Sequence, residues 1–298
     1  MKYRGAEALC IESSKLKAVF TVRGMKMVSL FDKTSGMEFL LQGGDTLIQG
    51  GYDADYGAVD ICGFDEMFPN IDACFYEREP WRGVSLPDHG EVWGIDWDHD
   101  TGENYIEAHV FGVRMPYKLS KRIYFITPET LRTDYTVQNL SIFDMDFAWT
   151  AHAMFELDDD SEIILPEGNT KGVVTFSSNE RLGRFGNIAD LNDLIYVMPG
   201  NVYTDKVYLQ GPVSNGICGV GYPSKGRSCM MGFPADTVPY LGVLNSNGMN
   251  IGKCAILEPC TGAFDRPDRA KARGMNYILK AKDCCVWHME ITIIDSWR

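Results

Sequence analysis

The chain has 298 residues, of which 45% are hydrophobic and 23% are charged, and its formal net charge is −13. These proportions are ordinary for a globular protein with a full core. The negative charge argues against a nucleic-acid partner, because phosphate binding requires a basic face. No segment approaches the roughly 20 consecutive apolar residues that span a bilayer, so we expect no membrane partner.

The first residues, MKYRGAEALCIESS, contain no apolar segment typical of a secretory signal peptide. Nine cysteines are present without a C-x-x-C pair, and Cys284 and Cys285 are adjacent. This arrangement suits neither a shared disulfide nor a zinc site, so we expect reduced, mostly buried thiols. These features predict a cytoplasmic protein with no metal.

Hydrophobic residues recur with a period of two along most of the chain, which is typical of strands. Residues 16–22 alternate in this way, and residues 31–41 predict a strand, a turn and a second strand. Residues 121–139 predict a hairpin about a Pro-Glu turn, and residues 286–293 predict a last alternating strand.

Convincing helices are scarce: we expect a short one near residues 189–195 and a helical turn after Pro267. The 30 glycines and 13 prolines are scattered between the strands, as many short connections require. The sequence therefore predicts an all-β protein, with one large antiparallel domain covering residues 1–298.

Two residues at strand positions are candidates for acid–base chemistry. His152 lies in the apolar run FAWTAHAMFEL, so it is either a core histidine with a satisfied ring or an acid in a dry cleft. Glu258 ends the apolar strand CAILE, and Pro259 biases it to extended geometry. It is therefore well placed to act as a base, although a solvated acid at a strand end is the alternative.

Two further stretches combine polar and aromatic residues. LPDHGEVWG contains His89, which is typical of a tight turn, and Trp93, whose ring face can stack on a sugar ring as on any apolar surface. GFDEMFPNI contains Asp65 and Glu66, which could bind hydroxyl groups or cap a loop. Each stretch alone has a structural explanation as well as a functional one.

Taken together, these stretches resemble the aldose 1-epimerase (galactose mutarotase) superfamily. The order is similar: a His-Gly in the first third, a histidine after a strand near the middle and a glutamate late in the chain. The stretches DKTSGMEFLLQG, DYTVQNLSIFDMDFAWTAHAMFEL and CAILEPCTGAFD carry the resemblance, which covers most of the chain.

The resemblance implies a galactose mutarotase-like super-sandwich of large antiparallel sheets, with a sugar cleft on a concave sheet. It implies an isomerase without a cofactor that interconverts the α and β anomers of a free or modified sugar. Glu258 matches the base, His152 the acid and His89 a histidine that binds the sugar. The expected partners are a small-molecule sugar and, in a homodimer, a second copy of the chain.

The sequence also departs from the family. Where the family carries an Asn-Arg that places an arginine in the cleft, this chain reads DEMFPNI. We therefore predict that Asp65 and Glu66 line the sugar site in place of the arginine, with Trp93 as a further sugar contact. Asp205 is our match for the family's sugar-binding aspartate. A phosphorylated sugar is disfavoured, because no arginine cluster lies near the motifs.

Two alternatives stay open, since fold does not fix function. One is a carbohydrate-binding protein without activity. The other is a lyase or hydrolase, which would need a second catalytic acid such as Asp65 or Glu66. The presence of both Glu258 and His152 favours the epimerase.

Overall fold

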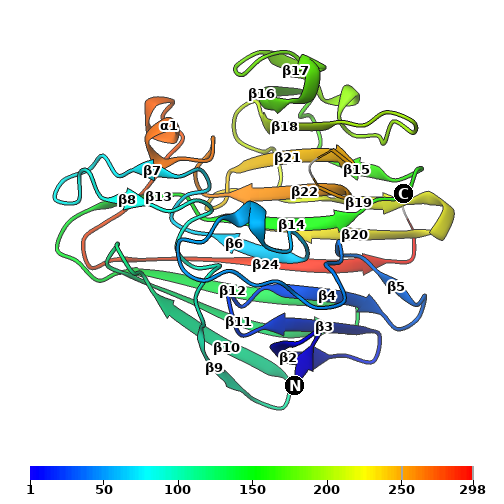
Figure 1. Cartoon of the computed structure of the whole chain (residues 1–298), viewed down its shortest axis with the longest axis horizontal. Helices are drawn as coiled ribbons and strands as arrows, with labels where there is room; N and C mark the ends of the chain where they lie inside the picture. The colour runs from blue at the N-terminus through cyan, green and yellow to red at the C-terminus, as the bar shows by residue number, and fades with distance from the viewer. Residues whose placement is uncertain (250, 297–298) are drawn as a thin grey trace.

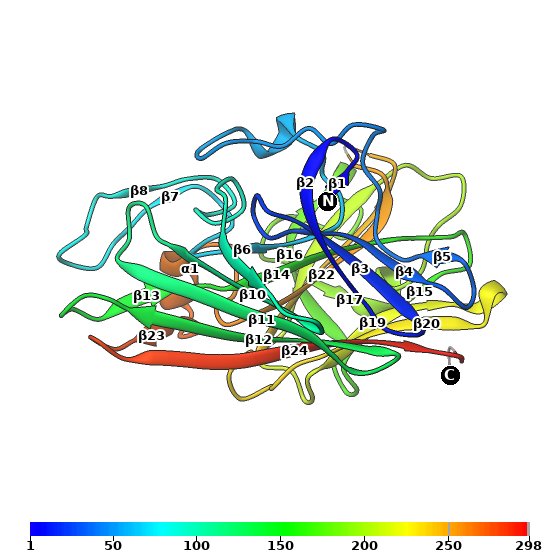
Figure 2. The ribbon, with the colours of Figure 1, turned by 90° about the horizontal axis from the view of Figure 1, so that it is seen from below.

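Two large sheets, one of 12 strands and one of 8, make up most of the protein in the computed structural model (Figures 1 and 2). The structure describes residues 1–249 and 251–296. Neighbouring strands pair antiparallel in both sheets. The predicted all-β class with large antiparallel sheets is therefore confirmed.

The 12-stranded sheet contains β1 (Lys2–Tyr3), β2 (Ala6–Glu12), β3 (Leu16–Thr21), β4 (Met27–Asp32), β6 (Phe64–Met67), β14 (Thr150–Glu156), β22 (Lys253–Cys260), β21 (Tyr240–Asn247), β18 (Thr204–Leu209), β16 (Lys171–Ser177) and β17 (Ile188–Asp190) in that spatial order, with β5 (Met37–Glu38) beside β4. The 8-stranded sheet runs β15 (Glu162–Ile164), β19 (Ile217–Tyr222), β20 (Arg227–Gly232), β24 (Cys284–Ile294), β12 (Thr130–Asn139), β11 (Tyr117–Thr127), β10 (Tyr105–Phe111) and β9 (Asp98–Thr101). Two short pairs join β7 (Cys74–Phe75) to β8 (Ser85–Leu86) and β13 (Met145–Phe147) to β23 (Tyr277–Leu279).

The main hydrophobic core draws side chains from both sheets. On β14, Ala151, Ala153 and Phe155 belong to this core. Successive side chains of a strand point to opposite faces, so His152 and Met154 face the other side of the sheet. The same alternation buries every second residue of β24 from Trp287 to Ile293, as the sequence pattern predicts.

The predicted hairpins are present: β4 and β5 are joined by a turn, and β11 pairs with β12. The prediction of a short helix near residues 189–195 is wrong. This segment begins as β17, which pairs with β16, and continues as the 3₁₀ turn η3 (Leu191–Asp193), whose first turn is capped by the Asp190 carboxylate. The apolar residues there serve a strand and a turn rather than a helical face.

In the described ranges, helical structure is otherwise limited to α1 (Pro267–Ala272), which begins at Pro267, where a helical turn is predicted, and to the 3₁₀ turns η1 (Tyr56–Ala58), η2 (Ser178–Glu180) and η4 (Pro223–Lys225). Within those ranges, no helix combines the length and apolar character needed to cross a membrane.

Candidate active site

Five strands of the larger sheet, β6, β14, β22, β21 and β18, are neighbours in that order (Figure 1). Asp65 pairs with His152, and Glu258 pairs with Gly242, which in turn pairs with Tyr208. These residues share the face of the sheet that is turned away from the main core. Residues far apart in the sequence thus meet on one surface.

His152 and Glu258 face each other within this row. Nε2 of His152 lies 3.8 Å from Oε1 of Glu258, and the exposed fractions of the two residues are only 5% and 1%. Nζ of Lys206 lies 2.8 Å from Oε2. Among the described residues, none donates a hydrogen bond to Oε1. A buried carboxylate oxygen beside an imidazole suits proton transfer.

Asp65 holds the far side of the His152 ring. Nδ1 of His152 lies 3.2 Å from Oδ1 of Asp65, which leaves Nε2 directed towards Glu258. Lys26 lies 3.4 Å from the other Asp65 oxygen. Burial alone would raise the pKa of the Asp65 carboxyl, but Lys26 and His152 lower that pKa well below its usual range. An ionised Asp65 fixes the orientation of the ring and stabilises the imidazolium form.

Tyr56, which begins η1, covers this pair. Its hydroxyl donates to Asp65 at 3.1 Å and lies 3.4 Å from Nδ1 of His152. The segment between β5 and β6 contains no other regular element than η1. The sequence does not point to Tyr56 as a site residue. Its segment shows no hydrophobic periodicity from which the direction of one side chain could be predicted.

His89 lies on the loop after β8, with φ at +59°, and its side chain is 20% exposed. Its Nδ1 lies 2.9 Å from Asp88, and its ring lies edge-on to His152 with centroids 5.8 Å apart. Gly90 follows with φ at +77°, and a Cβ there would lie 2.4 Å from the Phe68 carbonyl oxygen. The His-Gly pair therefore makes a close turn that brings His89 to the site.

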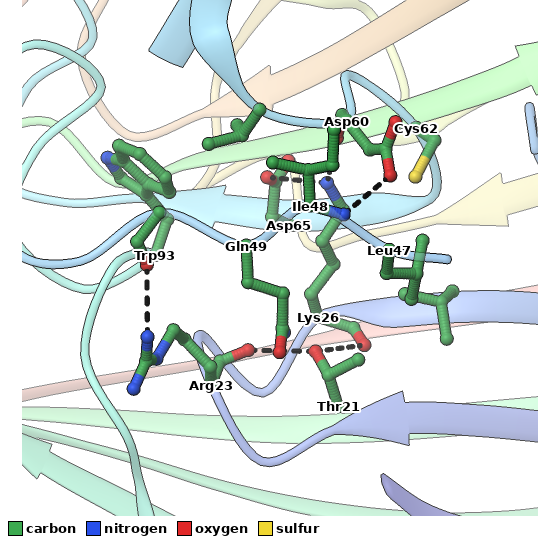
Figure 3. A pocket seen from close by; sticks show the side chains of 13 residues that line it. Thr21, Arg23, Lys26, Leu47, Ile48, Gln49, Asp60, Cys62, Asp65 and Trp93 are labelled. Atoms are coloured by element: carbon green, nitrogen blue, oxygen red, sulfur yellow. Dashed lines mark hydrogen bonds and ion pairs between the residues drawn. The ribbon is translucent and has the colours of Figure 1, made fainter. Parts of the chain in front are cut away.

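Trp93 joins the same group by packing edge-on to Tyr56, with centroids 5.1 Å apart. It also lines a small cavity on the outer side of Asp65, where Lys26 reaches both Asp65 and the Asp60 carbonyl oxygen (Figure 3). The cavity volume is about 30 Å³, which is room for about two water molecules and too little for a sugar ring.

Glu66 does not join this group, which corrects the prediction that both acids line the site. Its carboxylate accepts hydrogen bonds from Lys121 at 2.6 Å and Tyr135 at 2.8 Å, between the two sheets. The reason is the alternation of β6: when Asp65 faces His152, the next side chain must face the core.

Asp205 is also placed elsewhere, contrary to its match with a sugar-binding aspartate. It is buried against Ser177 and Arg181, each at 2.6 Å. The next residue, Lys206, faces the site instead. Lys206 contacts Asp265, which follows β22, at 2.7 Å, so Asp265 is the acid that accompanies Lys206 at the site.

The described residues contain no group of three or more His, Cys, Asp or Glu side chains arranged to hold a metal ion. The site is instead a network of hydrogen bonds and ion pairs around His152 and Glu258. Such a network can bind hydroxyl groups and exchange protons with them.

The sequence matches no protein-family model and no curated protein. A galactose mutarotase-like protein from Lactobacillus casei ATCC 334 has a similar structure, with a TM-score of 0.71 and 19% identity over 96% of this chain and 100% of that one. A galactose mutarotase-like protein from Clostridium acetobutylicum gives 0.72 and 13%, over 99% and 97%. A proposed aldose 1-epimerase from Escherichia coli K12 gives 0.70 and 16%, over 98% and 99%. The resemblance inferred from the sequence is confirmed at the level of architecture: the chain has the galactose mutarotase-like fold.

Proposed function

We propose that the protein is an aldose 1-epimerase, which interconverts the α and β anomers of an uncharged sugar without a cofactor. The observation that carries this proposal is the approach of His152 Nε2 to Glu258 Oε1 at 3.8 Å, on a sheet of the galactose mutarotase-like fold. A base and an acid so close together suit a reaction whose two reacting oxygens are bonded to the same carbon.

The proposed reaction uses these two groups in turn. The Glu258 carboxylate takes the proton from the O1 hydroxyl while protonated His152 gives a proton to the ring oxygen O5. The C1–O5 bond breaks and the O1–C1 bond becomes a carbonyl. After rotation about C1–C2, Glu258 returns its proton to O1, neutral His152 takes the O5 proton, and the ring closes. Each positioned group typically contributes about 10²–10⁴-fold to the rate.

The charges around the pair favour an uncharged sugar. Lys26 lies against Asp65, and Lys206 lies between Glu258 and Asp265. Both cations are thus already paired with carboxylates, which reduces the positive charge that they offer to a phosphate or uronate group. Repulsion by these carboxylates also disfavours an anionic substrate.

Entry of the sugar requires a change at the surface of the site, because His152 and Glu258 are buried. Tyr56 is the side chain we expect the sugar to displace. It covers His152, stacks on His89, and belongs to the segment between β5 and β6, which contains no strand. His89 then becomes free to bind a sugar hydroxyl, as the resemblance implies.

The test is saturation-transfer NMR of anomer exchange, with a panel of neutral aldoses, a uronic acid and a sugar phosphate. Exchange of at least one neutral aldose should exceed its spontaneous rate. Glu258→Gln should remove about 10²–10⁴-fold of this acceleration, whereas Glu156→Gln, an exposed glutamate on β14, should leave it unchanged. Binding shifts without any acceleration would instead favour a carbohydrate-binding protein.

A further inference from the structure

Lys206 reaches the candidate base from two strands away. Its Nζ lies 2.8 Å from Oε2 of Glu258, the oxygen that is not turned towards His152. Gly242 on the intervening strand makes this possible, since a Cβ there would lie 2.6 Å from Oε2. The lysine thus contacts one carboxylate oxygen and leaves the other free.

Asp265 holds Lys206 in this position. Its Oδ1 lies 2.7 Å from the Lys206 ammonium and also accepts the Tyr208 hydroxyl at 2.7 Å. Its backbone carbonyl accepts the N–H of Ile71 at 2.8 Å, and the Ile71 carbonyl accepts the N–H of His89. Asp265 has φ at +68°, in the left-handed region that few residues other than glycine, asparagine and aspartate adopt.

The titratable groups around Glu258 are His152, Lys206, Tyr208, Cys260, Asp265 and Tyr56. Lys206 supplies the positive charge in contact with Oε2. Burial alone would lower the pKa of Lys206, but the Asp265 and Glu258 carboxylates raise it above its usual value. The lysine therefore stays charged at neutral pH.

We propose that Lys206, held by Asp265, is the positioning residue that keeps Glu258 ionised and its free oxygen turned towards His152. The inference rests on the proposed function, in which Glu258 starts each ring opening as a carboxylate. Burial disfavours the charged form of an acid, whereas a cation within about 4–6 Å favours it. Removal of Lys206 should therefore favour the neutral form of Glu258, which cannot accept the O1 proton.

The kinetic test is the pH profile of kcat/KM for anomer exchange. In Lys206→Met the acid limb should move up by about 1–3 pH units, so the loss of activity relative to wild type should be smaller at higher pH. Lys206→Arg keeps a cation and should restore the acid limb towards the wild-type position. Lys26→Met is the charge-matched control: it removes a cation that contacts Asp65 rather than Glu258, so its acid limb should move less.

Infrared difference spectroscopy tests the same inference without using catalysis. At neutral pH, Lys206→Met should show the C=O stretching band of a protonated buried carboxylic acid. Wild type and the double variant Lys206→Met/Glu258→Gln should lack that band. Lys206→Gln provides a second neutral side chain if Lys206→Met fails to fold, which thermal unfolding will show.

The two measurements separate the inference from the function it rests on. If wild type does not accelerate exchange of any sugar, the proposed function fails, while the infrared band still decides whether Lys206 keeps Glu258 ionised. If a folded, active Lys206→Met keeps the wild-type acid limb and shows no band, the role of Lys206 is overturned.

Discussion

The rings of Tyr56 and His89 stack with their centroids 3.7 Å apart and an angle of 7° between their planes. The Tyr56 hydroxyl also donates to Asp65, the acid behind His152. One loop side chain thus contacts both the candidate sugar-binding histidine and the support of the candidate acid. The stability and the accessibility of the site are therefore linked through Tyr56.

Tyr56→Phe should lower the free energy of unfolding by about 1–3 kcal/mol, because the buried Asp65 carboxylate loses a hydrogen-bond donor while the ring stack remains. The matched control is Tyr196→Phe, whose hydroxyl also donates to a carboxylate, that of Glu162, but whose residue is 49% exposed. It should have little effect. Urea unfolding measures both changes, and equal losses would contradict the importance of the Tyr56 contact.

The ionisation of Asp65 should appear in the pH dependence of stability. The folded pKa of Asp65 is lower than its unfolded value, which is about 3.9. Asp65 therefore stabilises the fold above about pH 4, and this contribution disappears as the pH falls towards the folded pKa. Denaturant unfolding between about pH 3 and 7 should show the advantage of wild type over Asp65→Asn shrinking below pH 4. A constant difference would count against the ionised Asp65.

The adjacent acids on β6 should differ in their effect on activity. Glu66→Gln leaves the Lys121 ammonium buried without its carboxylate, so it should cost about 3–5 kcal/mol of stability with kcat/KM of the folded protein unchanged. Asp65→Asn should lower kcat and kcat/KM, by up to about 10⁴-fold, because it removes the carboxylate that orients His152 and stabilises its imidazolium form. Steady-state exchange rates and denaturant unfolding of both variants test this contrast. A similar fall in kcat/KM for the two variants would contradict it.

Position 90, which follows His89 in the turn, should accept only glycine without a loss of stability. Gly36→Ala should cost about 1–2 kcal/mol, because φ there is +73° with open space around the new Cβ. Gly90→Ala combines φ of +77° with a Cβ 2.4 Å from the Phe68 carbonyl oxygen, so it should cost a further ~1–3 kcal/mol. It should also raise KM by displacing His89. Equal free energies of unfolding for the two variants would show that the contact between the new Cβ and the Phe68 carbonyl oxygen does not destabilise the fold.

The sequence predicts the position of a side chain best where a local pattern or a motif contains that residue. The apolar runs around His152 and Glu258, together with the resemblance, singled out these two residues, and the structure brings them within 3.8 Å. The alternation of side chains along a strand could have excluded one of Asp65 and Glu66, since neighbours on a strand cannot both face the site. The same alternation places the side chains of Asp205 and Lys206 on opposite faces of β18.

The remaining site residues depend on contacts that no local pattern encodes. Tyr56 lies in a segment rich in glycine and aspartate, which is anchored by Arg114 to Asp53 at 2.7 Å and by Tyr52 to Glu91 at 3.0 Å. Asp265 is placed by a backbone turn with positive φ at a residue that is not glycine. Both positions follow from long-range packing, which a single sequence does not display.

The central claim, that His152 and Glu258 act together on the anomeric centre, is tested most directly by a double-mutant cycle of anomer exchange. Saturation-transfer NMR would compare wild type, His152→Gln, Glu258→Gln and the double variant on a neutral aldose that wild type accelerates. Groups that act as one unit are strongly non-additive, so each single variant should lose nearly as much acceleration as the double variant. A double variant that loses the product of the two single effects would contradict a joint role, and a wild type no faster than the spontaneous reaction would contradict the epimerase itself.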